Sequence, residues 1–222
     1  RRFYRAWYQP SRMAVVAVGD IEPTQLKTEL AQRFGSLSTH PAPPEPDMTL
    51  PPRLGQRHVT ALDPETPVTT AELAYVHTEP RLATSADYRR LLTRELALAI
   101  LNERLEDQTQ SAGTPLLHAG ISVNPLDHQH SLYTLAARTT GPRLLDSFAA
   151  LQKEQTRITT LGVTRDELER EKADYLAGLD QAVSDQHRIA SGVYVEAYVS
   201  HYLSGDPYLD VSEERRQSAQ AL

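Results

Sequence analysis

Residues 7–20 read WYQPSRMAVVAVGD, and residues 21–34 continue as IEPTQLKTELAQRF. The apolar run from Met13 to Val18 ends at a glycine, which is typical of a strand covered on both faces. The residues that follow place apolar side chains four apart, on one face of a helix: Leu26, Leu30 and Phe34. The stretch therefore predicts a buried strand, a turn and a helix, and its single glycine after the strand excludes a G-x-G-x-x-G nucleotide site.

The composition is that of a globular protein. Of the 222 residues, 40% are hydrophobic and 23% are charged, and no apolar run is long enough to span a bilayer. The absence of cysteine excludes disulfides, cysteine nucleophiles and zinc–cysteine sites. The net charge of −6, without a basic cluster, argues against a nucleic-acid partner. Both ends fall inside predicted helices, so we expect a fragment of a longer protein.

The rest of the chain alternates period-two and helical patterns, with strands first and helices last. Predicted strands cover 57–62, 69–77, 116–123 and 131–138, and predicted helices cover 84–110, 141–161, 165–184, 186–203 and a last segment capped by Ser212. The last two strands should form an antiparallel pair. This order predicts one α+β domain over 1–222, a largely antiparallel sheet packed against a layer of helices. Residues 36–56 form a proline-rich connecting strap, and 206–222 begin a truncated following segment.

The eight histidines were compared with the spacing that a zinc site needs. No two histidines are four apart, so a helical site of the zincin type is excluded. The closest pair, His128 and His130, lies beside Asp127 in a predicted hairpin loop. This trio is either a weak metal site or a solvated polar loop, because no third well-placed ligand is evident.

Three tyrosines recur at helical spacing near the end of the chain. Tyr194, Tyr198 and Tyr202 lie on one helix face, and Arg188 precedes them by a turn and a half. One interpretation is packing at the edge of the core. The other is a row of hydroxyls that faces a cavity and binds a peptide backbone, which makes these four residues the candidate peptide-facing site.

Several motifs in order resemble the second domain of pitrilysin/insulinase-family zinc peptidases. They are FYxxWYxPxxMAVVAVGD at 3–20, the Phe34-Gly35 pair, the proline-rich strap, the helix containing residues 96–105, and TRDELEREKA at 164–173. The resemblance spans essentially the whole chain and is strongest to long single-chain bacterial members. Arg12 stands where asparagine is common in the family.

The resemblance implies a metallohydrolase-like domain of the pitrilysin/mitochondrial-processing-peptidase type. Zinc in such proteins is held by an H-x-x-E-H motif and a later glutamate in the preceding domain. That motif is absent here, so no catalytic or metal residue is assigned, and the chain alone is expected to be inactive. The parent is expected to be a zinc metalloendopeptidase acting on peptides or unfolded polypeptides.

Within such a parent, this chain would brace the upstream catalytic domain and line the substrate chamber. The alternatives are a domain of an inactive homologue that serves as a scaffold or processing partner, and a stand-alone peptide-binding module. Peptide or unfolded polypeptide would be the partner, without nucleic acid or a membrane span. The resemblance favours the periplasm, and the cytoplasm stays open.

Overall fold

A computed structural model describes residues 1–38, 40, 43, 44, 47, 49, 50, 55–127, 129–205 and 207–222. The chain divides into two compact units, and each is described by itself. Unit 1 comprises Arg1–Pro52 and Asp185–Tyr208, and unit 2 comprises Arg53–Ser184 and Leu209–Leu222. Much of the predicted proline-rich strap lies outside the described residues, so the strap stays a prediction, as do the single domain over 1–222 and the truncated segment at 206–222.

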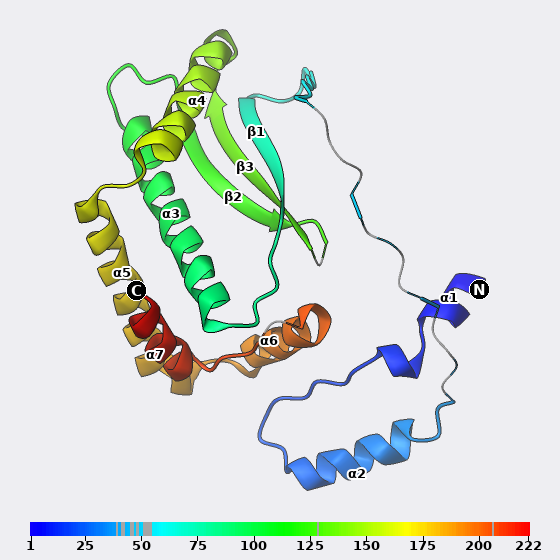
Figure 1. Ribbon diagram of the computed structural model, residues 1–222. Coiled ribbons are helices and arrows are strands. Elements are labelled where there is room, and N and C mark those ends of the chain that lie inside the picture. The colour runs from blue at the N-terminus through cyan, green and yellow to red at the C-terminus, as the bar shows by residue number, and fades with distance from the viewer. Residues whose placement is uncertain are drawn as a thin grey trace. The chain divides into compact units, whose positions relative to one another are not determined.

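Unit 2 is built on a three-stranded antiparallel sheet in the order β1-β3-β2 (Figure 1). The strands are β1 (Thr69–Thr78), β2 (His118–Pro125) and β3 (His130–Thr139). The register sets Ala137 opposite Ala71 on one side and opposite Ala119 on the other. The predicted antiparallel hairpin of β2 and β3 is confirmed, and so is the predicted strand at 69–77.

One face of this sheet is apolar and covered by helices α3 (Ser85–Thr109) and α4 (Leu144–Leu161). Figure 1 shows α3 running alongside the three strands, and α3 packs on β2 while α4 packs on β3 and β1. The buried cluster combines side chains from both helices with every strand: Ala71, Leu101, Leu105, Leu116, Ala119, Leu135, Ala137 and Leu151. Alternation along the strands sends the neighbouring residues to the other face, which none of the described helices of unit 2 covers (Figure 1).

Two further helices complete unit 2. They are α5 (Arg165–Asp185), whose last residue belongs to unit 1, and α7 (Val211–Ala221). The predicted capping box at the start of α5 is confirmed, since Thr164 Oγ1 accepts from the Glu167 N–H while the Glu167 carboxylate accepts from the Thr164 N–H. Helix α7 is capped by Asp210, whose Oδ1 accepts from the Glu213 N–H. The predicted Ser212 cap is wrong because Ser212 already lies inside the helix.

The described residues of unit 1 form three α-helices, which are α1 (Arg2–Trp7), α2 (Pro23–Phe34) and α6 (Ser191–Ser204). A 3-10 turn at Pro10–Arg12 follows α1, and another at Gln186–Arg188 precedes α6. Aromatic contacts stabilise the start of the chain: Tyr4 and Tyr8 stack with ring centroids 4.2 Å apart, and the Arg12 guanidinium lies 4.8 Å from the Trp7 ring. None of the described hydrophobic residues of unit 1 is fully buried.

Two predicted strands are wrong. The run from Met13 to Val18 has extended geometry at Met13, with φ −116° and ψ 145°, but it forms no ladder, and Met13 and Val15 are more than half exposed. Residues 57–62 also lack strand structure, and Val59 is 91% exposed. The physical reason is that a strand exists only with a hydrogen-bonded neighbour. An apolar run indicates burial, but it does not say which segment supplies that neighbour, and the described part of unit 1 contains no other strand.

Candidate functional site

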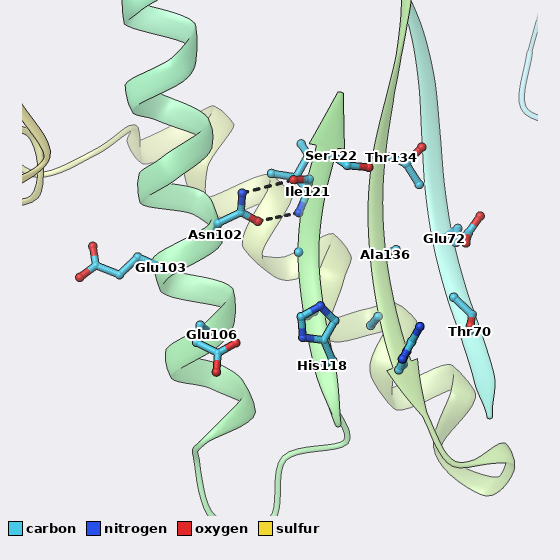
Figure 2. A pocket seen from close by; sticks show the side chains of 14 residues that line it. Thr70, Glu72, Asn102, Glu103, Glu106, His118, Ile121, Ser122, Thr134 and Ala136 are labelled. Atoms are coloured by element: carbon cyan, nitrogen blue, oxygen red, sulfur yellow. Dashed lines mark hydrogen bonds between the residues drawn. The ribbon is translucent and has the colours of Figure 1, made fainter. Parts of the chain in front are cut away.

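A pocket of 710 Å³ lies on the open face of the unit 2 sheet, with α3 along one side (Figure 2). Its floor is made of small residues from adjacent strands, including Gly120, Ser122, Thr134 and Ala136. Its sides carry charge, with Glu72 and Arg138 from the strands and Glu103 and Glu106 from α3, together with His118. The hollow lies where two neighbouring pairs of this register, Gly120 with Ala136 and Ser122 with Thr134, present small side chains.

Asn102 is the best-defined polar group in the pocket. It projects from α3 toward β2, where its Oδ1 accepts from the Ile121 N–H at 2.8 Å and its Nδ2 donates to the Ile121 carbonyl at 3.2 Å (Figure 2). One side chain thereby satisfies both backbone groups of one strand residue. Gly120 lies beside it, and a Cβ at Gly120 would stand 3.1 Å from Asn102 Oδ1.

One carboxylate of α3 in the pocket, Glu103, forms an ion pair. Arg170 binds both oxygens of Glu103 at 2.9 and 3.0 Å. Glu171 directly follows Arg170 in α5. Burial is the main cause that raises the pKa of Glu171, and the neighbouring charges of Asp174 and Glu103 raise it further. Among the residues that the structure describes, no group of three or more His, Asp or Glu side chains could hold a metal ion. Zinc therefore does not fit any cluster in the described chain.

A second polar network joins Glu79, which directly follows β1, to α3 and β3. The Glu79 carboxylate accepts from the Arg94 guanidinium at 2.5 Å and from the Tyr133 hydroxyl at 2.9 Å. Burial raises the pKa of Tyr133, and its hydrogen bond to Glu79 acts in the same direction. The edge of the His77 ring contacts Tyr133 with centroids 4.8 Å apart. Glu79 is thus paired with both Arg94 and Tyr133, which is the arrangement of a structural network.

The Asp127/His128/His130 trio can be judged only in part because His128 lies outside the described residues. His130 Nδ1 contacts both oxygens of Asp127 at 2.8 and 2.9 Å, and Asp127 Oδ1 also accepts from the backbone N–H groups of Gln129 and His130. The pKa of Asp127 is lowered, first by the Gln129 backbone N–H and then by the His130 side chain. Asp127 thus acts as a turn-forming residue that fixes the β2–β3 hairpin.

The four candidate peptide-facing residues belong to unit 1, whereas the pocket belongs to unit 2. Tyr194, Tyr198 and Tyr202 lie on α6 as expected, and Tyr198 and Tyr202 are 38% and 47% exposed. Tyr198 also packs on the Tyr208 ring at 4.8 Å, and Arg188 lies 3.9 Å from Asp185. Their role in binding peptide stays a prediction.

Sequence reasoning did not identify the pocket residues. Asn102 sits on an expected helix, and Gly120 and Ala136 sit on expected strands, but none carries a motif of its own. A signal was present in the small side chains at alternate positions of β2 and β3. These positions could be recognised as one surface only from the strand register, which sets Gly120 opposite Ala136.

Comparison with known proteins decides the family. The sequence profile described as the peptidase M16 inactive domain matches residues 1–175. The chain belongs to this family. This finding confirms the resemblance to the second, non-catalytic domain of pitrilysin/insulinase-type peptidases and the α+β fold class inferred with it.

Two curated relatives of the M16 domain are described as zinc proteases. The probable zinc protease PqqL of Escherichia coli is 26% identical over 226 residues, covering 96% of this chain and 23% of the relative. A PQQL-like zinc protease of Arabidopsis thaliana is 21% identical, and the match covers 96% of this chain and 20% of the relative. The chain thus spans less than a quarter of the length of these relatives.

Solved structures share the fold of the M16 domain. The periplasmic protease PqqL of Escherichia coli superposes with a TM-score of 0.86 at 20% identity, covering 100% of this chain and 24% of that protein. An insulinase-family protease of Yersinia pestis gives a TM-score of 0.84 at 16% identity, and the match covers 99% of this chain and 48% of that protein. Across the described residues, no helix has the length and apolar character required to cross a membrane.

Proposed function

We propose that this M16 inactive domain forms part of a zinc endopeptidase that hydrolyses peptides or unfolded polypeptides. In this proposal the domain supplies no catalytic group. It braces a catalytic domain encoded upstream and lines the chamber that receives the substrate. The observation that carries the proposal is the inactive-domain match over residues 1–175, in a chain without the H-x-x-E-H motif.

The uncovered sheet face supports a chamber-lining role. Helices α3 and α4 bury the other face, so this one is free to border a space. Its pocket presents hydroxyl, amide and carboxylate groups over a floor of small side chains. Such a surface favours polar contact with a polypeptide over a fixed apolar fit, because it offers many hydrogen-bonding groups and no deep hydrophobic slot.

Zinc and the compartment follow from relatives and are proposals for this chain. The curated relatives are zinc proteases, and the described residues here offer no metal cluster. Zinc would therefore be bound by another domain of the same polypeptide, where it would supply a metal-activated water. One solved relative is described as a periplasmic protease, and we propose the same compartment for the parent of this chain.

The tyrosine row is a second element of the proposal. Tyr198 and Tyr202 expose more than a third of their surface, so their hydroxyls can bind carbonyl groups of a peptide. Arg188, whose side chain is 87% exposed, would attract acidic residues of the substrate. Replacing both tyrosines by phenylalanine in the full-length protein should raise KM for a fluorogenic peptide, with little change in kcat.

The proposed function is tested by comparing the full-length protein with residues 1–222 alone. We expect the full-length protein to contain zinc and to cleave a quenched fluorogenic peptide, and we expect a chelator to abolish that cleavage. The isolated chain should show neither property. Cleavage by the isolated chain would contradict the proposal. A full-length protein without zinc and without activity would instead identify an inactive homologue that acts as a scaffold or processing partner.

A further inference from the structure

The outer edge of β2 is closed by a side chain. Asn102 accepts a hydrogen bond from the Ile121 N–H at 2.8 Å and donates one to the Ile121 carbonyl at 3.2 Å (Figure 2). These are the two groups that a neighbouring antiparallel strand would engage at this position. The amide of Asn102 therefore occupies the place of a peptide unit in an added strand.

The direction of the Ile121 groups follows from the ladder. In an antiparallel pair, alternate residues turn their N–H and C=O toward the partner or away from it. The Leu126 N–H donates to the His130 carbonyl, which marks the even-numbered residues of β2 as those bonded to β3. The backbone N–H and C=O groups of Ile121 and the other odd-numbered residues of β2 therefore point away from β3. One of these residues, Pro125, has no N–H to donate.

The site is shaped to admit the Asn102 side chain. Gly120 presents no Cβ, and a Cβ there would lie 3.1 Å from Asn102 Oδ1, closer than ordinary contact. Asn102 itself is only partly buried. The carboxylate that follows it in α3, Glu103, is paired with Arg170. The plug is thus held by two hydrogen bonds rather than by packing alone.

We propose that Asn102 is an autoinhibitory plug that controls strand addition to this sheet. While it is seated, an extended polypeptide cannot bond to Ile121. When it swings away, the outward N–H and C=O of Ile121 become available, and a polypeptide segment adds to β2 as an extra strand. This inference rests on the proposed function for the class of its ligand, an unfolded polypeptide.

The groups around Ile121 favour an unfolded polypeptide as the ligand. The groups that Asn102 covers are backbone groups in strand geometry, which match the backbone of an extended chain and no small anion or cation. The adjoining pocket has a floor of small residues, Gly120 and Ser122 among them, so side chains of many kinds can project over it. The edge carries no lysine to repel an added strand.

The test uses the full-length protein with any zinc removed by a chelator, so that the probe is not cleaved. The probe is a fluorescein-labelled, reduced and carboxymethylated lactalbumin, which stays unfolded. Asn102→Ala should bind it about tenfold more tightly than wild type, roughly the net worth of two added hydrogen bonds. Hydrogen exchange of the Ile121 amide should become faster in the unbound variant. Asn124→Ala, on the same strand, is the matched control and should change neither quantity.

A second variant keeps the test decisive if Asn102→Ala does not fold. Asn102→Asp retains an oxygen that accepts from the Ile121 N–H but cannot donate to its carbonyl, so the amide should stay protected while affinity rises only a few-fold. A folded Asn102→Ala with unchanged affinity, or with unchanged exchange at Ile121, overturns the plug. Wild-type protein that neither binds nor cleaves the probe counts against the proposed function. Even then, faster exchange of the Ile121 amide together with binding of the probe by Asn102→Ala would support the plug.

Discussion

Arg104 should be the most stability-critical charge of unit 2. Its side chain, only 8% exposed, joins three helices. It binds both oxygens of Glu167 on α5 at 2.7 and 2.8 Å, Glu154 on α4 at 3.4 Å, and the Gly162 carbonyl at 3.2 Å. Arg104→Met keeps an unbranched apolar stem and removes the charge.

The expected loss follows from what Arg104→Met leaves behind. Glu154 is 3% exposed, and its remaining partners are Gln108 at 2.9 Å and Arg157 at 3.5 Å. Breaking a buried ion pair costs about 3–5 kcal/mol, and the two remaining partners place this variant near 3 kcal/mol. Replacing Glu154 by leucine in the same protein should recover about 2 kcal/mol, because an apolar pair needs no compensation for charge burial.

Urea unfolding should be followed by far-ultraviolet circular dichroism. Fluorescence is unsuitable because the single tryptophan, Trp7, lies in unit 1. Arg170→Met is the matched control: Arg170 also binds a carboxylate with two hydrogen bonds, but its side chain is 52% exposed. It should cost far less than Arg104→Met, because an exposed ion pair contributes little to stability. Equal losses for Arg104→Met and Arg170→Met would refute the reasoning.

The same network predicts a pH dependence. Hydrogen bonds from Arg104 and from the Thr164 backbone hold the pKa of Glu167 far below its ordinary value of 4.5. A depressed pKa in the folded state stabilises the protein above the unfolded value, and that stability is lost as the pH falls below about 4.5. In Arg104→Met the loss of stability on acidification should therefore be shallower than in wild type.

Three further predictions concern other contacts. Gly120→Ala should lower stability by about 1 kcal/mol, because its Cβ would press on Asn102, and thermal unfolding measures this. Thr164→Ala should cost about 1 kcal/mol through loss of the cap bond to Glu167, seen in the urea midpoint. Burial raises the pKa of Tyr175 to about 12, so stability present below pH 10 should decline as the pH rises toward 12. Tyr175→Phe should flatten that decline, and an unchanged profile would contradict this account.

The sequence predicted the parts of the fold that depend on local pattern. The long helix α3, the β2–β3 hairpin and the Thr164–Glu167 capping box could all be predicted because spacing and cap chemistry act within a few residues. The strands predicted at Met13–Val18 and 57–62 failed for the opposite reason. Their hydrogen-bond partners are not specified by the residues themselves, and apolar character alone cannot supply a ladder.

The candidate site was harder to predict than the fold. Asn102 and Gly120 are 18 positions apart in sequence and have no motif in common. Their meeting depends on how α3 lies along β2, which is a matter of packing. The tyrosine row was visible from the sequence because its spacing lies within one helix, but a shared helix face does not reveal what that face contacts.

The division of the chain has a consequence for its synthesis. Unit 1 joins residues 1–52 to residues 185–208, and nearly all of unit 2 lies between them. A ribosome adding about 5–20 residues per second delivers the second segment roughly 7–27 seconds after the first. When residues 185–208 emerge, the strands and α3 of unit 2 are already complete, whereas residues 1–52 have lacked the other half of their unit. The sheet of unit 2 can therefore form before unit 1 is complete.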